Sequence, residues 1–248
     1  MSSKRRTVAT LPRRRMSQAP SSPASPQHRG ISRRQLFSVA GIAVLGTAGV
    51  IAAGNLLRDD AGSTPVTSTA GIPITERVKG VATAPVTIVE YADLQCPVCA
   101  RLSQTVEPQI EAAFIGPGVA RLEFRHFAFL GPESLRAAEA CECAAEQGAF
   151  FSYCDALYAA QDGENRGAFR DDALRRIASE IGLDSRAFGD ALASGRHADT
   201  VRQQTAEGRT FGIKATPTFI INGAKLKGLA QFETYKRMIE QAAGESAS

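Results

Sequence analysis

The sequence predicts an α/β fold in which a β-α-β unit and a β-β-α unit flank a long helical block. The first unit is indicated by a β-branched run over residues 86–89, a helix-like segment and an alternating strand pattern over residues 119–129. Alanine-rich segments that stop at glycines fill most of residues 133–212, and two short strands and a helix follow. The 248 residues, 44% apolar and 22% charged, are enough for a leader and one large domain, or for two small domains.

The first 57 residues have the pattern of an export segment. Residues 35–57 carry no charge, and they follow a stretch that is rich in basic residues and free of acids. The sequence "SRRQLF" at residues 32–37 resembles the twin-arginine signal of bacteria. The basic residues of this leader are Lys4, Arg5, Arg6, Arg13, Arg14, Arg15, Arg29, Arg33 and Arg34.

Two outcomes stay open for the apolar segment. A signal peptidase would remove it, or residues 36–57 would remain as a membrane anchor and keep the chain in contact with the bilayer, because about 20 apolar residues span a bilayer. In both cases the folded part is expected outside the cytoplasm, in the periplasm, the cell wall or the medium. Nine of the 29 basic residues lie in this leader, so acids outnumber bases in the remainder and nucleic-acid binding is disfavoured.

A linker and then a single folded domain are expected after the leader. Residues 58–80 are rich in Gly, Ser, Thr and Pro, which predicts a flexible linker with a short strand near residues 72–75. The domain is predicted over residues 81–243. Its first strand at 86–89 leads into a helix predicted from 96 to 114, and the sequence "GPG" at 116–118 ends that helix.

The second half of the domain completes the architecture. A helical insertion is predicted over about residues 131–212. The segment "TPTFIINGAKLKG" then gives a strand, an Asn222-Gly223 hairpin turn and a second strand, and "QFETYKRMIEQAA" gives a terminal helix. This order of elements is that of a thioredoxin-like fold with an inserted helical subdomain.

Two cysteines in a C-x-x-C spacing lie where the first strand ends and the first helix begins. The positive end of a helix dipole stabilises an anion, so a thiolate at this position has a lowered pKa and is a good nucleophile. Cys96 is therefore predicted to be the exposed attacking thiol. Cys99, one turn further in, can close a disulfide with it or resolve a mixed disulfide, and Pro97 stiffens the turn.

The domain resembles the DsbA-like thiol–disulfide oxidoreductases of bacteria. The resemblance covers about residues 80–243 and rests on "APVTIVEYADLQCPVC", "FLGPESLRAAEA", "CAAEQGAFF" and "GIKATPTFIING". It implies that Pro217 is the family's cis proline and that Thr216 and Pro217, beside Pro97 and Val98, contact a substrate peptide. It also implies exchange with exported cysteine-containing proteins and resetting by a membrane protein, either DsbB-like or vitamin-K-epoxide-reductase-like.

The resemblance also assigns a role to Glu90, six residues before Cys96. It matches a buried acid that carries a proton to or from Cys99, although a surface glutamate at a strand end stays open as the alternative. No histidine lies between the cysteines, which argues against a very oxidising potential. An oxidase is favoured, with a reductase or isomerase as the alternative, and neither an organic cofactor nor a metal is expected.

The role of the three further cysteines has more than one possible interpretation. A zinc site or a copper-carrying module built from the five cysteines is disfavoured, because Cys141 and Cys143 are two apart in a helix and point to different faces. Cys154 could instead pair with Cys141 or with Cys143 in an oxidising compartment, or all three could be buried thiols.

The remaining polar candidates have no motif context. His126 and His197 are expected to be surface histidines or to support other side chains rather than react. The pair Asp171-Asp172 is expected to cap a helix.

Overall fold

The computed structural model describes residues 66–67 and 72–246. The predicted leader over 1–57, with its twin-arginine pattern and anchor segment, lies outside the described residues. Within the described part of the chain, no helix has the length and apolar character needed to cross a membrane.

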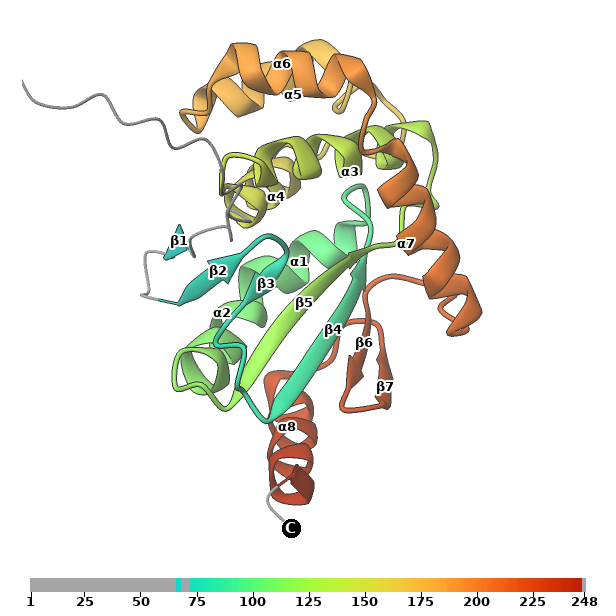
Figure 1. Cartoon of the computed structure of the whole chain (residues 1–248). Helices are drawn as coiled ribbons and strands as arrows, with labels where there is room; N and C mark the ends of the chain where they lie inside the picture. Colours follow the sequence, from blue (N-terminus) through green and yellow to red (C-terminus); the bar gives the residue numbers. More distant parts are fainter. Residues whose placement is uncertain (1–65, 68–71, 247–248) are drawn as a thin grey trace, which may run out of the picture. The chain divides into compact units, whose positions relative to one another are not determined.

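The described residues form a mixed sheet with the strand order β1-β2-β3-β5-β4-β6-β7 (Figure 1). Its centre is a parallel pair, in which Val86 of β4 lies opposite Ala120 of β5 and Ala92 lies opposite His126. The strands β6 and β7 extend the sheet on the β4 side as an antiparallel hairpin. The bounds are Val66–Thr67 for β1, Pro73–Thr75 for β2, Val78–Lys79 for β3, Val86–Ala92 for β4, Ala120–His126 for β5, Thr218–Ile221 for β6 and Ala224–Lys227 for β7.

The predicted linker ends earlier than expected. A short strand near residues 72–75 is confirmed as β2, but β3 follows it and pairs antiparallel with β5. The prediction of a flexible linker that extends to residue 80 is therefore wrong. Lys79 of β3 is buried, and its ammonium group lies 4.3 Å from the centre of the Phe151 ring. Tertiary contacts of this kind order a segment whose local composition favours a loop.

The helix predicted over 96–114 is interrupted. It consists of α1 (Pro97–Thr105), α2 (Glu107–Ile110) and a π-helical turn (Glu111–Ile115). The break falls at Val106, two residues before Pro108, because proline has no N–H to donate to the preceding turn and its ring crowds that turn. This broken helix and the terminal helix α8 (Phe232–Ser246) contact each other and pack on the main core.

The alternation of β4 divides its side chains between two faces of the sheet. Val86 and Ile88 join the main hydrophobic core, whereas Tyr91 joins a small cluster with Phe127 and Ile213. The helix α7 (Ala198–Thr210) covers this second face closely, since a Cβ atom on Gly208 would lie 2.7 Å from the Phe127 ring. Glu90 shares the face of Ile88, so its carboxyl group points into the main core.

The helical insertion lies beyond the end of the sheet at which β4 and β5 finish, except for α7, which runs alongside the sheet (Figure 1). It contains α3 (Pro132–Ala145), α4 (Phe150–Ala159), α5 (Asp171–Glu180), α6 (Ser185–Ser194) and α7 (Ala198–Thr210). The predicted cap at Asp171-Asp172 is wrong, because Arg170 is the cap residue and both acids lie in the first turn of α5. Asp171 instead pairs with Arg136 of α3, with an N–O distance of 2.7 Å.

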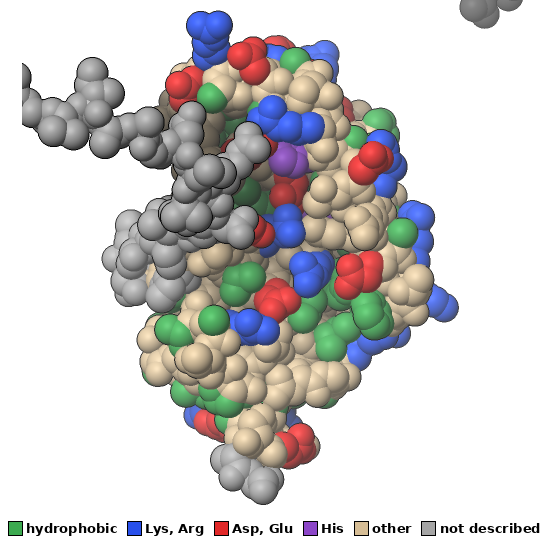
Figure 2. Space-filling model, in the orientation of Figure 1, with side chains coloured by type: hydrophobic (Ala, Val, Ile, Leu, Met, Phe, Trp, Pro, Cys, Tyr) green, Lys and Arg blue, Asp and Glu red, His purple; other side chains and the backbone are tan. Residues whose placement is uncertain are grey.

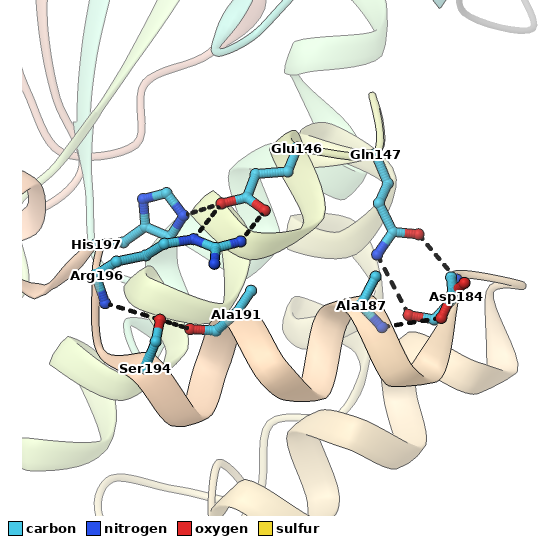
Figure 3. Close-up of polar contacts among 8 residues, drawn as sticks. All are labelled: Glu146, Gln147, Asp184, Ala187, Ala191, Ser194, Arg196 and His197. Atoms are coloured by element: carbon cyan, nitrogen blue, oxygen red, sulfur yellow. Dashed lines mark hydrogen bonds and ion pairs between the residues drawn. The ribbon is translucent and has the colours of Figure 1, made fainter.

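Polar contacts lock the end of α3 onto α6 and α7 (Figure 3). The carboxylate of Glu146 accepts from Arg196 and lies 2.6 Å from a ring nitrogen of His197. The amide of Gln147 pairs with the backbone of Asp184, whose own side chain caps α6. These contacts connect the end of α3 with both ends of α6 and with the start of α7.

Candidate active site

The two thiols of the C-x-x-C sequence lie at the start of α1. Cys96 is the residue before the helix, and Pro97 occupies the first helical position, where a missing N–H has no cost. The Cys96 side chain is 6% exposed and Cys99 is fully buried. Cys96 is thus the more accessible of the two, as predicted, but the description of it as exposed is wrong.

The Cys96 sulfur atom lies beside the backbone of a distant loop. Its Sγ lies 3.4 Å from the backbone oxygen of Thr216, which belongs to the loop before β6. The bond between Thr216 and Pro217 is cis, as the resemblance implied. Pro97 is exposed and Val98 half-buried, whereas Pro217 is buried. Backbone from two distant parts of the chain therefore flanks the sulfur.

The two thiols have opposite acidities. A hydrogen bond from Cys99 is the largest cause that lowers the pKa of Cys96 to about 6; burial opposes it, and Thr216 and backbone N–H groups add to the lowering. Burial raises the pKa of Cys99 well above its usual range, and the Cys96 sulfur raises it further. At neutral pH, Cys96 is therefore the thiolate and Cys99 the thiol.

The titration of Cys96 provides a direct test of this arrangement. In the reduced protein, the ultraviolet absorbance of the thiolate should rise with a midpoint near pH 6. Because the folded pKa lies below that of the unfolded chain, the thiolate stabilises the reduced fold fully above about pH 9, and this stabilisation is lost as pH falls through about 6. A Cys99→Ser variant keeps a hydroxyl donor and serves as the control; a wild-type midpoint near pH 9 would contradict the assignment.

Glu90 lies beneath the thiol pair, in the main core. It is 1% exposed, and neither carboxylate oxygen has a hydrogen-bond partner among the described residues. The surface alternative is therefore wrong. Burial is the first cause that raises the pKa of Glu90 well above its usual range; Glu107 raises it further and Lys79 opposes the shift.

A charged cluster connects Glu90 on β4 with Lys79 on β3. Lys79 of β3 pairs with Glu111, and Glu107 is buried beside them. Burial raises the pKa of Glu107 to about 7, with Lys79 opposing the shift. Sequence reasoning missed this cluster because Lys79 lies in the predicted linker and Glu107 in a helix predicted to be regular. The one feature of the sequence that pointed to the cluster is the acid directly before Pro108, where the helix is interrupted.

Asp93 organises the loop between β4 and Cys96. Its Oδ1 accepts from the backbone of Gln95 and from the Ser134 hydroxyl, and its Oδ2 accepts from the backbone of Phe129 and Leu130, all at 2.6 to 3.1 Å. One carboxylate thus ties the active-site loop to the end of β5 and to the start of α3. The sequence "ADLQCPVC" contained this residue, but no spacing marked it.

The helical insertion also holds this loop. The side chain of Gln161 donates to the backbone oxygens of Leu94 and Cys96, at 2.7 and 3.3 Å. The backbone of Asn165 donates to the side chain of Gln95 at 2.6 Å. The insertion therefore helps to position the active-site loop. These hydrogen bonds reach the loop and not the Cys99 thiol.

The histidines lie away from the thiols. His126 is buried and its Nε2 lies 2.9 Å from the Glu142 carboxylate, so of the two expected positions it has the one that supports another side chain and not the one at the surface. His197 lines a cavity of about 440 Å³ together with Glu76, Arg77, Glu142, Ala145, Glu146 and Thr200. Figure 2 shows a histidine between basic and acidic side chains in a hollow of the surface. In that cavity Arg77 pairs with Glu142 and His197 contacts Glu146, and none of the residues that line it is a cysteine.

Comparison with known proteins places this geometry in a family. A family model described as thioredoxin matches residues 73–241. The chain belongs to the thioredoxin family. Within the family it is DsbA-like, because oxidised BdbD from Bacillus subtilis superposes with a TM-score of 0.64 at 26% identity, covering 68% of this chain and 93% of that one.

Two curated relatives differ in how much of their length is matched. The "Probable disulfide bond formation protein D" of Bacillus anthracis is 26% identical over 171 residues, which cover 67% of this chain and 78% of that protein. A "Na(+)/H(+) antiporter NhaA 3" of Salinispora tropica is 34% identical over 172 residues, which cover 68% of this chain. The chain spans only 25% of that antiporter's length.

Proposed function

We propose that this DsbA-like chain is an exported thiol–disulfide oxidoreductase that acts mainly as an oxidase. The observation that carries the proposal is the contrast between Cys96, with a pKa of about 6, and the buried, high-pKa Cys99. A thiol of low pKa is a good leaving group, so the reduced enzyme is stabilised and the enzyme disulfide is readily given to a substrate.

The exchange takes two steps. A substrate thiolate attacks the Cys96 sulfur of the Cys96–Cys99 disulfide, which forms a mixed disulfide and releases Cys99. The released Cys99 thiolate takes a proton, for which Glu90 is the nearby acid. A second substrate thiolate then attacks the substrate sulfur of the mixed disulfide, and Cys96 leaves as a thiolate. The substrate has lost two electrons, and the enzyme pair holds them.

The neighbours of Cys96 fit the docking of a peptide. The backbone of Thr216 lies beside the sulfur, next to Pro217, and Pro97 with Val98 forms the opposite border. An extended substrate segment could pair with this backbone and present its cysteine to Cys96. Exported cysteine-containing proteins are the proposed substrates, and a DsbB-like or vitamin-K-epoxide-reductase-like membrane protein is the proposed oxidant of the reduced pair.

The reduction potential of the Cys96/Cys99 pair tests the direction of exchange. We expect a value between that of thioredoxin, roughly −270 mV, and that of the strong oxidant DsbA, roughly −120 mV, because the pKa of Cys96 is lowered only to about 6. Equilibration with glutathione, followed by quantification of alkylated thiols, measures it. A value at or below roughly −270 mV would instead make the chain a reductase.

A further inference from the structure

A second pair of cysteines lies within the helical insertion. The Sγ atoms of Cys141 on α3 and Cys154 on α4 are 2.9 Å apart. Both side chains are buried, with 0% and 2% of their surface exposed. The proposed exchange at Cys96 uses neither of them, so their juxtaposition needs its own explanation.

We propose that Cys141 and Cys154 form a second, structural disulfide that ties α3 to α4, and that Cys143 remains a free thiol. A disulfide has an S–S distance of about 2.05 Å, so the two sulfur atoms need to approach by less than about 1 Å. The two helices are consecutive in the sequence and pack against each other. This pairing also decides between the two partners that the sequence allowed for Cys154.

Cys143 is the unsuitable partner. It lies two positions after Cys141 on the same helix, so it points to a different face. The groups that influence its acidity, after burial, are Glu146 and Arg196 rather than another sulfur. The Cys141 sulfur, by contrast, lies 2.9 Å from the Cys154 sulfur, so Cys141 is the residue of the two that meets Cys154 on α4.

The burial of the pair determines when the bond can form. Burial raises the pKa of both Cys141 and Cys154, and a protonated, covered thiol is a poor nucleophile. We therefore place oxidation before α3 and α4 have closed on each other. One thiolate attacks a donor disulfide, either glutathione disulfide or the disulfide of an oxidase. The second thiolate then displaces the donor, which leaves as two thiols with the two electrons.

The two pairs then behave differently during turnover. Cys96 is the more exposed thiol of the active-site pair and is acidic, so the active-site disulfide opens and closes with each substrate. The second disulfide is covered on all sides and stays closed. It fixes α4, which contacts α1 and carries Tyr158, a buried residue whose pKa is raised by burial and by the nearby Cys99 and Glu90.

Thiol mapping of the full-length protein tests the pairing. The protein is refolded with glutathione disulfide, denatured without reductant, alkylated and cleaved with a glutamate-specific protease, which separates the three cysteines after Glu142 and Glu146. In a Cys96→Ser/Cys99→Ser background, we expect one alkylated thiol, at Cys143, and one cross-linked pair of peptides that contain Cys141 and Cys154. Three alkylated thiols, or a link through Cys143, would overturn the proposal.

Thermal unfolding in the same background tests the structural role. Reduction should lower the melting temperature by about 5 to 10 °C, the effect expected for a disulfide that closes a loop of this length in a domain of this size. The shift should persist in Cys143→Ala and vanish in Cys141→Ala. If Cys141→Ala does not fold, the comparison of oxidised and reduced Cys143→Ala protein still decides: equal melting temperatures would refute the role.

Discussion

Replacing Cys96 with serine should abolish disulfide exchange, with a loss of at least about a thousandfold in the rate of oxidation of a reduced peptide. A serine hydroxyl is not ionised at neutral pH, whereas the Cys96 thiol, with a pKa of about 6, is almost entirely thiolate. The rate of disulfide formation in a fluorescent two-cysteine peptide, with glutathione disulfide as the final oxidant, measures the loss. A variant that kept most of the wild-type rate would show that Cys96 is not the attacking thiol.

The other cysteines supply matched controls for this experiment. Cys143→Ala removes a buried thiol outside the site and should keep the wild-type rate. Cys99→Ser keeps the attacking thiol but removes the resolving one, so it should accumulate a mixed disulfide with a substrate peptide, visible by mass spectrometry. Trapping at Cys99 in the Cys96→Ser variant would reverse the assigned roles.

Glu90→Gln should slow the exchange by roughly tenfold to a hundredfold, at the lower end of what acid–base catalysis contributes. The glutamine has nearly the same shape but carries no proton to or from Cys99. The loss should be largest for the step that releases or deprotonates Cys99, and the pH dependence of that step should flatten. Stopped-flow rates of enzyme reduction and oxidation across a pH series separate this step from substrate binding.

The same variant should be more stable than the wild type at neutral and alkaline pH. The pKa of Glu90 is raised in the fold. Its contribution to the free energy of unfolding is therefore fully present below about pH 4.5 and is lost as pH rises through the folded pKa. Glutamine has no such titration and removes the loss. Glu123→Gln on the neighbouring strand, whose partners are Arg121 and Arg125 nearer the surface, is the control and should change neither rate nor this pH dependence. A rate unchanged by Glu90→Gln would limit Glu90 to packing.

The strand and helix start that carry the site are predicted well from the sequence, because the signals for them are local. The β-branched run marked β4, the C-x-x-C spacing marked the start of α1, and the Asn222-Gly223 turn marked the final hairpin. Each of these features is specified within a few residues of chain, and the structure confirms them.

The missed features depend on contacts between distant residues. Lys79 is ordered by Glu111 and Phe151, which no composition of the linker could indicate. The hydrogen-bond partners of Asp93 lie after the end of β5 and in α3, 36 to 41 positions away in the sequence. The break at Val106 was visible as Pro108 in the sequence, but the strength of the surrounding helical pattern outweighed it.

The support of the active-site loop by remote residues has a consequence for biosynthesis. The partners of the loop are Ser134, Gln161, Asn165 and finally Thr216, which lies 120 positions after Cys96. Because synthesis proceeds from the N-terminus, the growing chain contains both reactive thiols long before the residues that position them have been added. Its redox chemistry is acquired late, once the insertion and the last strands have been made, and an interrupted chain carries the C-x-x-C cysteines without the environment that sets their reactivity.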